Sequence, residues 1–287
     1  MRHLERLRAV GFGALGVLVL VVLWDLYTAF GPTDGVSVGD TLVLPRSNQF
    51  MPHSWEIVQR LGEPLRTGAD DTVMGAVWDA SMFTLSLAGQ GFLLGVVVGL
   101  VLAVLMTRLR VAEQGLLPWI VLSQTVPLIA LAPLVNRIGS QFGDGWTKEN
   151  SVVLIASYLA FFAVAVGALR GFKSPQSTHL ELMDAYGAGW WRTFFTLRVP
   201  ASAPYLLPAL RLAAASAVIG AVVAEVSMTL KGGIGRMVVD FAQSASSDPA
   251  KAYAPILGAV IVGLAAAGAV GLVGVVLRHY KLTGAHA

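Results

Sequence analysis

Long apolar runs alternate with short polar segments along the whole chain. The apolar runs cover residues 9–30, 81–106, 114–136, 151–169, 204–230 and 252–277. A helix needs about 20 residues to cross the hydrocarbon core of a bilayer, so each run has the length of one crossing. The pattern therefore predicts an all-α integral membrane protein with about six transmembrane helices.

The runs divide the chain into three segments. These are 1–30, an N-terminal tail, which we expect in the cytoplasm, with the first span; 31–79, a segment expected outside the cytoplasm; and 80–287, a five-helix core that includes a polar loop at 171–205. The middle segment is polar, rich in Gly, Pro and Asp, and has no spanning run. Within it, Trp55, Val58 and Leu61 share one helical face and predict a short amphipathic helix at the membrane interface.

Two interpretations of the first apolar run are possible. Arg2, Arg6 and Arg8 precede it, and a basic start before an apolar stretch is typical of a secretory signal peptide. However, the run is longer than the apolar region of a signal peptide, and no small-x-small cleavage site follows Trp24. The sequence therefore favours an uncleaved first span, with a signal peptide as the alternative.

Composition supports a membrane protein and excludes several other classes. Only 13% of the residues are charged, about half the share in soluble domains, and 55% are hydrophobic. The chain has no Cys, which excludes a disulfide framework and thiol chemistry. The net charge of +3 is better explained by basic cytoplasmic loops than by nucleic-acid binding, because no basic cluster is interleaved with aromatic residues.

The distribution of basic residues predicts the orientation. With a cytoplasmic N-terminus, 12 of the 20 Lys and Arg lie inside. These are Arg2, Arg6, Arg8, Arg108, Arg110, Arg170, Lys173, Arg192, Arg198, Arg211, Arg278 and Lys281. Because cytoplasmic loops are enriched in Lys and Arg, we expect both termini and the loop 171–205 in the cytoplasm.

That loop, which we call the coupling loop, carries the most specific pattern in the sequence. Apolar residues recur at helical spacing on both sides of a glycine-rich turn at 187–189: Leu180, Met183 and Gly187, then Trp191, Phe194 and Phe195. The spacing predicts two short amphipathic helices. The second is expected to end at Pro200, and Pro204 is also expected to stop a helix, because proline lacks a backbone N–H.

The same residues resemble a known family motif. Glu181 stands six residues before Gly187, and Leu197 stands ten after it, followed by Val199 and Pro200. This spacing is similar to the cytoplasmic loop of binding-protein-dependent ABC importer permeases, which has Glu-Ala-Ala, three residues, Gly, nine residues and Ile-x-Leu-Pro. Leu182-Met183 replaces Ala-Ala here. The chain looks most like the branch that serves nitrate, sulfonates, taurine and pyrimidine-like solutes.

The resemblance implies a type I permease fold in the bacterial cytoplasmic (inner) membrane. It implies that the coupling loop binds a separate ATPase through Glu181, Leu182, Met183, Ala185, Tyr186, Gly187, Leu197, Val199 and Pro200. The implied partners are a second permease copy or a sister permease, two ATP-binding ATPase subunits and an extracytoplasmic solute-binding protein. ATP and Mg²⁺ belong to the ATPase, so no cofactor is expected on this chain. The implied cargo is a small organic or oxyanion solute.

Five residues inside or beside the spans are candidates for the translocation pathway or its gate: Gln124, Pro127, Glu225, Gly233 and Gly235. Glu225 lies within a span, where an ionisable group is costly and marks a functional candidate. The alternative is that it reaches the outer interface or pairs with Lys231 or Arg236. The stretch from Gln124 to Pro127 either lines the pathway with exposed carbonyls or only kinks the helix.

Glycines at helical spacing predict close helix packing in lipid. Gly91, Gly95 and Gly99 form a small-residue stripe in the second span. Such a stripe can pack against another helix of the same subunit or form a seam between two subunits. We expect packing within one subunit, with the seam as the alternative.

No enzyme site is predicted. The chain lacks the phosphate-binding loop Gly-x-x-x-x-Gly-Lys-Ser/Thr and a Gly-x-Ser-x-Gly nucleophile elbow, and its five His residues have no metal-ligand spacing. We therefore expect neither catalytic residues nor a metal site. The alternatives to an ABC permease are an ion-coupled secondary transporter, for which inverted repeats are not evident, and a membrane enzyme or scaffold.

Overall fold

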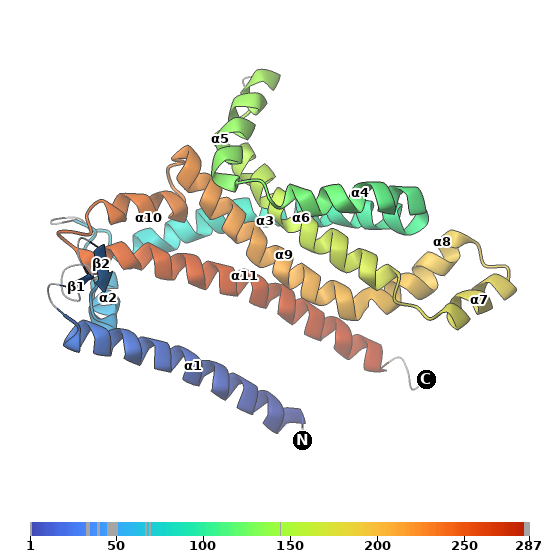
Figure 1. Cartoon of the computed structure of the whole chain (residues 1–287), viewed down its shortest axis with the longest axis horizontal. Coiled ribbons are helices and arrows are strands. Elements are labelled where there is room, and N and C mark those ends of the chain that lie inside the picture. The colour runs from blue at the N-terminus through green and yellow to red at the C-terminus, as the bar shows by residue number, and fades with distance from the viewer. Residues whose placement is uncertain are drawn as a thin grey trace. The chain divides into compact units, whose positions relative to one another are not determined.

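The computed structural model describes residues 2–32, 35–38, 41–44, 51–66, 68, 70–143 and 145–283, and these are almost entirely helical (Figure 1). The expectation of an all-α protein is confirmed. Two short antiparallel strands, β1 (Val36–Val38) and β2 (Thr41–Leu44), form a hairpin that the hydrophobic pattern did not predict. Positions 33–34, 39–40, 45–50, 67 and 69 of the predicted extracytoplasmic segment lie outside the described residues.

The helices follow one another with short connections. They are α1 (Arg2–Phe30), α2 (Ser54–Leu61), α3 (Val73–Arg108), α4 (Arg110–Ser123), α5 (Leu128–Gly139), α6 (Lys148–Phe172), α7 (Ser177–Ala185), α8 (Trp190–Thr193), α9 (Val199–Met228), α10 (Ile234–Ala242) and α11 (Pro249–Thr283). A 3₁₀ turn at Ser140–Phe142 follows α5, and a π-helical turn at Phe194–Arg198 joins α8 to α9.

Five of the described helices are long and apolar enough to cross a membrane, and a sixth span results if α4 and α5 count as one. This agrees with the prediction of about six. The pair α4–α5 is bent by 106°. The third predicted span is therefore not a straight helix, because it is interrupted between Ser123 and Leu128.

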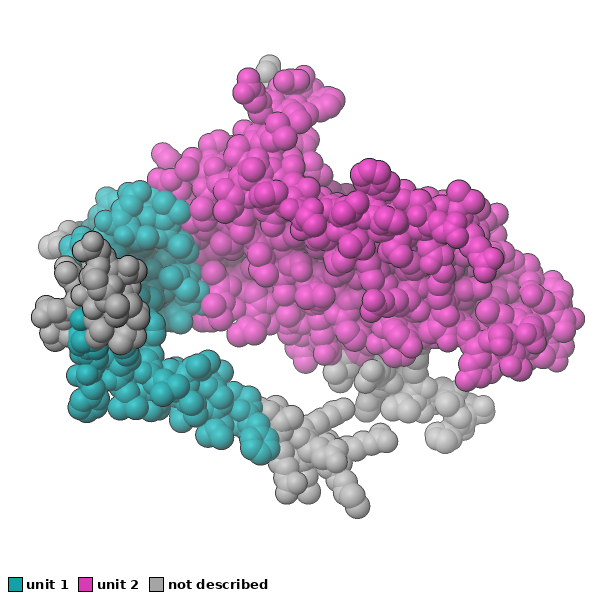
Figure 2. Space-filling model, in the orientation of Figure 1, with its two compact units in different colours: residues 1–78, 237–257 teal, residues 79–236, 258–287 magenta. Residues whose placement is uncertain are grey.

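The chain forms two compact units (Figure 2). Unit 1 contains residues 1–78 and 237–257, and unit 2 contains residues 79–236 and 258–287. The second unit starts one residue before the permease core expected from the sequence, and it does not include 237–257.

Unit 2 is organised around α6, which packs closely against α3 and α9. A Cβ atom on Gly91 or Gly95 would lie 2.4 or 2.7 Å from the Cβ of Ala156 or Ala160, so only glycine permits this approach of α3 to α6. In α6, a Cβ on Gly167 would lie 2.3 Å from the Cβ of Ala209 in α9. The glycine stripe therefore packs within one subunit, as expected, and van der Waals contact between small residues holds the three helices together.

In unit 1 the C-terminal end of α1 is bound to α2. The carboxylate of Asp25 accepts hydrogen bonds from the backbone N–H of Ser54 at 2.8 Å and from its hydroxyl at 2.6 Å. The indole N–H of Trp24 donates to the carbonyl of Pro52 at 2.9 Å. Asp25 therefore caps the N-terminus of α2, where an anion is favoured.

Candidate functional site

The coupling loop contains the two short helices that its sequence predicted. α7 and α8 flank a turn at which Gly187 has a φ of +67°, the left-handed region that glycine adopts most easily. The N–H of Gly187 donates to the carbonyl of Asp184, and the N–H of Ala188 donates to that of Met183, both at 2.9 Å. This pair of bonds is a Schellman motif, which satisfies the last carbonyls of α7. A Cβ on Gly187 would meet no atom within 4 Å, so the turn alone requires glycine.

Two large apolar side chains stay exposed among the polar residues of α7 and its C-cap. α7 buries none of its residues. Leu182 is 51% exposed and Tyr186, one turn later at the helix end, is 79% exposed, whereas Leu180 and Met183 are half-buried. Large apolar side chains that stay exposed together mark an interaction surface. The surface therefore centres on Leu182 and Tyr186, with Glu181 and Ala185 exposed beside them.

Pro200 does not end the second helix of the loop. It lies in the first turn of α9, and Pro204 lies inside the same helix, so the prediction that these prolines stop helices is wrong. Proline is tolerated in the first helical turn, where its missing N–H would have no partner. The π-helical turn Phe194–Arg198 precedes it directly, and π-helical turns often occur at functional sites. Leu197, Val199 and Pro200 therefore form the continuous entry into α9.

The second half of the loop is anchored in the core of unit 2. Phe194 is 4% exposed and packs edge-on against Phe172 of α6, with ring centres 4.9 Å apart. The guanidinium of Arg198 donates to the carbonyl of Phe172 at 2.9 Å. The loop therefore has an exposed first half and a second half fixed to α6.

Glu225 lies at the other end of α9 and is fully buried. Its carboxylate accepts a hydrogen bond from the hydroxyl of Thr84 in α3 at 2.8 Å and one from the backbone N–H of Gly235 at 2.9 Å. The same hydroxyl accepts from the N–H of Ile234 at 2.9 Å. Glu225 is therefore not exposed at a surface, because the side chain is enclosed between α3, α9 and α10.

This network holds the start of α10. The first N–H groups of a helix have no partner within the helix and attract an anion, and here Thr84 and Glu225 satisfy two of them. A Cβ on Gly233 would lie 2.3 Å from the carboxyl carbon of Glu225, so the turn before α10 passes directly over the carboxylate. At the end of α9, the ammonium of Lys148 donates to the carbonyl of Met228 at 2.9 Å. Opposite charges therefore stabilise the two helix ends at this reversal.

Sequence reasoning found Glu225 but missed Thr84 and Lys148. Thr84 is one hydroxyl in an apolar run, and it lies 141 residues from Glu225 along the chain. Lys148 looked like one more charged residue in a polar loop. The only local signal for this network was the glycine pair at 233 and 235, which indicates a close approach but not what approaches.

The segment from Gln124 to Pro127 breaks the third span, as its proline suggested. Gln124 is the last helical cap of α4, and Pro127 precedes α5 with φ of −65° and ψ of 111°. The hydroxyl of Tyr158 in α6 donates to the carbonyl of Ser123, one of the carbonyls freed by the break. The break is therefore held against α6, and its role in the pathway stays a prediction.

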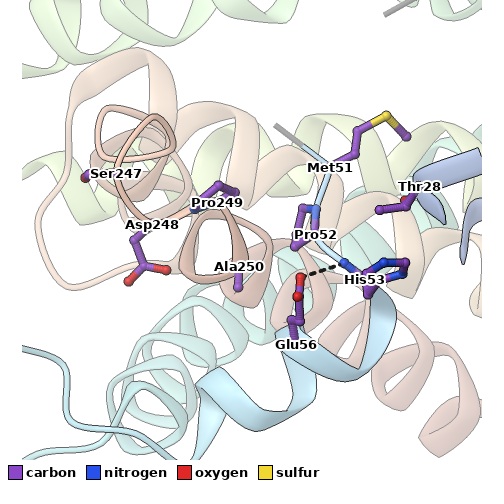
Figure 3. A pocket seen from close by; sticks show the side chains of 9 residues that line it. All are labelled: Thr28, Met51, Pro52, His53, Glu56, Ser247, Asp248, Pro249 and Ala250. Atoms are coloured by element: carbon purple, nitrogen blue, oxygen red, sulfur yellow. Dashed lines mark hydrogen bonds between the residues drawn. The ribbon is translucent and has the colours of Figure 1, made fainter. Parts of the chain in front are cut away.

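A cavity of about 370 Å³ with a mixed polar and apolar lining lies within unit 1 (Figure 3). Glu56 points into it and accepts a hydrogen bond from the backbone N–H of His53 at 2.9 Å. Asp248, on the other wall, forms an ion pair with Arg60 at 2.8 Å. Both carboxylates therefore hold α2 and the start of α11 in place. Among the described residues, no cluster of His, Asp and Glu could hold a metal ion.

Comparison with known proteins identifies the family of the chain. The chain is 35% identical to the formylaminopyrimidine transport permease ThiX of Halalkalibacterium halodurans over 60% of this chain and 70% of that protein. It is 30% identical to the aliphatic sulfonates transport permease SsuC of Bacillus subtilis (61% and 60%) and to the riboflavin transport system permease RibX of Chloroflexus aurantiacus (53% and 54%). Residues 95–280, which include the coupling loop and Glu225 but not its partner Thr84, match one family throughout. The chain is therefore a multi-pass membrane protein and belongs to the binding-protein-dependent transport system inner membrane component family.

Proposed function

We propose that this chain forms the solute pathway of an ABC importer and is driven by a separate ATPase that binds the coupling loop. The geometry of α7 carries the proposal: two exposed apolar side chains, Leu182 and Tyr186, lie beside a Schellman turn at Gly187, and the second half of the loop is fixed to the core. A rigid apolar projection of this kind fits a groove on a partner protein. ATP and Mg²⁺ bind to that partner and not to this chain.

The coupling loop and the Glu225 network lie at opposite ends of α9. A helix of 30 residues is about 45 Å long, enough to cross the membrane. With both termini and the coupling loop in the cytoplasm, the Glu225 network lies at the extracytoplasmic end of the pathway. We assign Glu225, Gly233 and Gly235 to a gate at that end, and Gln124 and Pro127 to the pathway.

The cargo is a small organic or oxyanion solute that an extracytoplasmic binding protein delivers. The relatives support this class, because they are named for transport of formylaminopyrimidine, aliphatic sulfonates and riboflavin. Two permease chains, either two copies of this one or this chain with a sister permease, enclose the pathway and bind two ATPase subunits.

A pull-down from the native membrane in mild detergent tests the proposal, with bound proteins identified by mass spectrometry. We expect an ATPase with the wild type and not with Gly187→Arg, because the left-handed turn disfavours any β-carbon and the added charge occupies the binding face. Gly187→Asn is the control, since Asn tolerates this conformation. Absence of an ATPase from the wild type would refute the proposal and favour an ion-coupled transporter.

A further inference from the structure

Arg108, the last residue of α3, lies beside the first two residues of α8. Its guanidinium carbon is 5.2 Å from the ring centre of Trp190 and 5.4 Å from that of Trp191. We propose that Arg108 is a positioning residue that clamps α8 to the end of α3, so that movement of the coupling loop is passed to α3. This inference rests on the proposed function and adds a second route into the pathway besides α9.

The contact has the geometry of a double cation–π interaction. The two indole rings are nearly perpendicular, at 86°, and their centres are 4.6 Å apart, so they form two walls of a corner. A guanidinium within about 6 Å of a ring centre is attracted by the negative face of the ring. In the part of the chain that the structure describes, no carboxylate forms an ion pair with Arg108. The two rings are therefore the contacts that position this cation.

The aromatic contacts continue from the clamp into the core. Trp190 stacks on Phe194, with ring centres 5.0 Å apart and planes 9° apart. Phe194 packs against Phe172 in the buried cluster that also contains Ala103 and Met106 of α3. A displacement of α8 therefore moves side chains that contact both α3 and α6.

The part of α3 that contains Gly91, Gly95 and Gly99 cannot move independently of α6. Gly91, Gly95 and Gly99 bring the two backbones into direct contact, with a virtual Cβ 2.8, 2.9 and 2.8 Å from carbonyl oxygens of α6. Interfaces packed this closely move as rigid bodies or shift between discrete arrangements. A movement of the C-terminal end of α3 is therefore transmitted along α3 and α6 toward Thr84 and the Glu225 network.

The clamp also explains why the two halves of the loop differ. α7 buries none of its residues and offers its surface to a partner. α8 buries Thr193 and is joined to α3 by Arg108, and the π-helical turn after it joins α6 through Phe194 and Arg198. The first half thus binds, and the second half transmits the movement.

Limited trypsin digestion of the purified chain tests the clamp without any partner. Arg108→Gln removes the cation, Arg108→Lys retains it, and Arg110→Gln removes an exposed cation two residues away as the matched control. Cleavage after Arg192 requires α8 to detach locally. We expect cleavage about tenfold faster in Arg108→Gln, since losing two exposed cation–π contacts shifts the attached-to-detached equilibrium by about that factor. Arg108→Lys and Arg110→Gln should stay within about threefold of the wild type.

Reconstituted vesicles with the co-purified ATPase test the transmission. We expect Arg108→Gln to bind the ATPase normally and to hydrolyse ATP, while solute uptake per ATP falls about tenfold, with recovery in Arg108→Lys. Unchanged digestion and an unchanged ratio of uptake to hydrolysis in Arg108→Gln would overturn the inference. Faster digestion with an unchanged ratio of uptake to hydrolysis would show that Arg108 positions α8 but does not pass its movement to α3. A wild type without ATP-driven uptake refutes the proposed function instead, and the digestion then decides alone whether Arg108 positions α8.

Discussion

The hydrogen-bond network around Glu225 makes a quantitative prediction about the start of α10. Thr84→Val removes the hydroxyl that donates to Glu225 at 2.8 Å and accepts from the N–H of Ile234 at 2.9 Å, with little change of shape. Glu225→Gln keeps one acceptor oxygen but replaces the other with an amide that cannot accept. Because the N–H of Gly235 donates to Oε2 of Glu225, the amide nitrogen takes the place of Oε1 and loses the bond from Thr84, which is the contact that the two substitutions share.

The size of each effect follows from the groups left without partners. Thr84→Val leaves the buried N–H of Ile234 unpaired, at about 1–3 kcal/mol, and also loses the bond to Glu225. Glu225→Gln loses about one hydrogen bond, which lowers the free energy of unfolding by about 1 kcal/mol. The bond between Thr84 and Glu225 is lost only once in the double variant. We therefore expect the double variant to lose less unfolding free energy than the two single variants together, by about 0.6 to 1.7 kcal/mol, the average and the maximum for polar pairs inside membranes.

The assay is equilibrium unfolding of the purified protein in mixed micelles, followed by far-UV circular dichroism. Thr84→Ser keeps the hydroxyl and should restore most of the loss. Thr107→Val is the matched control, because the Thr107 hydroxyl donates only within its own helix, to the carbonyl of Ala103.

Additivity would refute this reasoning. If the losses of unfolding free energy in the two single variants add up to the loss in the double variant within about 0.5 kcal/mol, Thr84 and Glu225 do not interact. In transport, we expect Glu225→Gln to lower uptake less than Gly187→Arg does. Complete loss of uptake in Glu225→Gln would instead place the carboxylate in the pathway itself.

Three further predictions concern the coupling loop, the helix packing and unit 1. Gly187→Ala should weaken ATPase binding about five- to thirtyfold, because a β-carbon on a residue in the left-handed conformation costs about 1–2 kcal/mol. Gly189→Ala, at φ of −64°, should bind the ATPase normally in the same titration. Equal affinities of the two variants would exclude a role for the strained turn. Gly95→Leu should destabilise the protein by about 1–3 kcal/mol or more, since its β-carbon would lie 2.7 Å from that of Ala160. Gly89→Leu, at a glycine that faces open space, is the control in thermal melting. Equal melting temperatures of the two variants would contradict the close packing of α3 against α6. Asp25→Ala should speed hydrogen exchange at the start of α2 about fivefold or more, because it removes a cap of about 1 kcal/mol; exchange at the rate of the exposed control Asp71→Ala would show that the cap is unimportant.

The sequence by itself determined the features that depend on neighbours along the chain. Apolar run lengths predicted the spanning helices, and the spacing of residues around Gly187 predicted a helix, a glycine-rich turn and a second helix. The proline at position 127 indicated the break in the third span. These inferences hold because helix length, turn conformation and proline geometry are set by local backbone chemistry.

Only the tertiary structure decided what lies beside each of these features. Pro200 was predicted to end a helix, but the preceding π-helical turn lets α8 continue into α9. Glu225 was recognised as unusual, yet its partner Thr84 is 141 residues away. The same holds for Asp25 with Ser54 and for Arg108 with Trp190. Spacing along a chain carries no information about such pairs, because a polar group within the membrane is stabilised by whichever partner the packing of other helices brings to it.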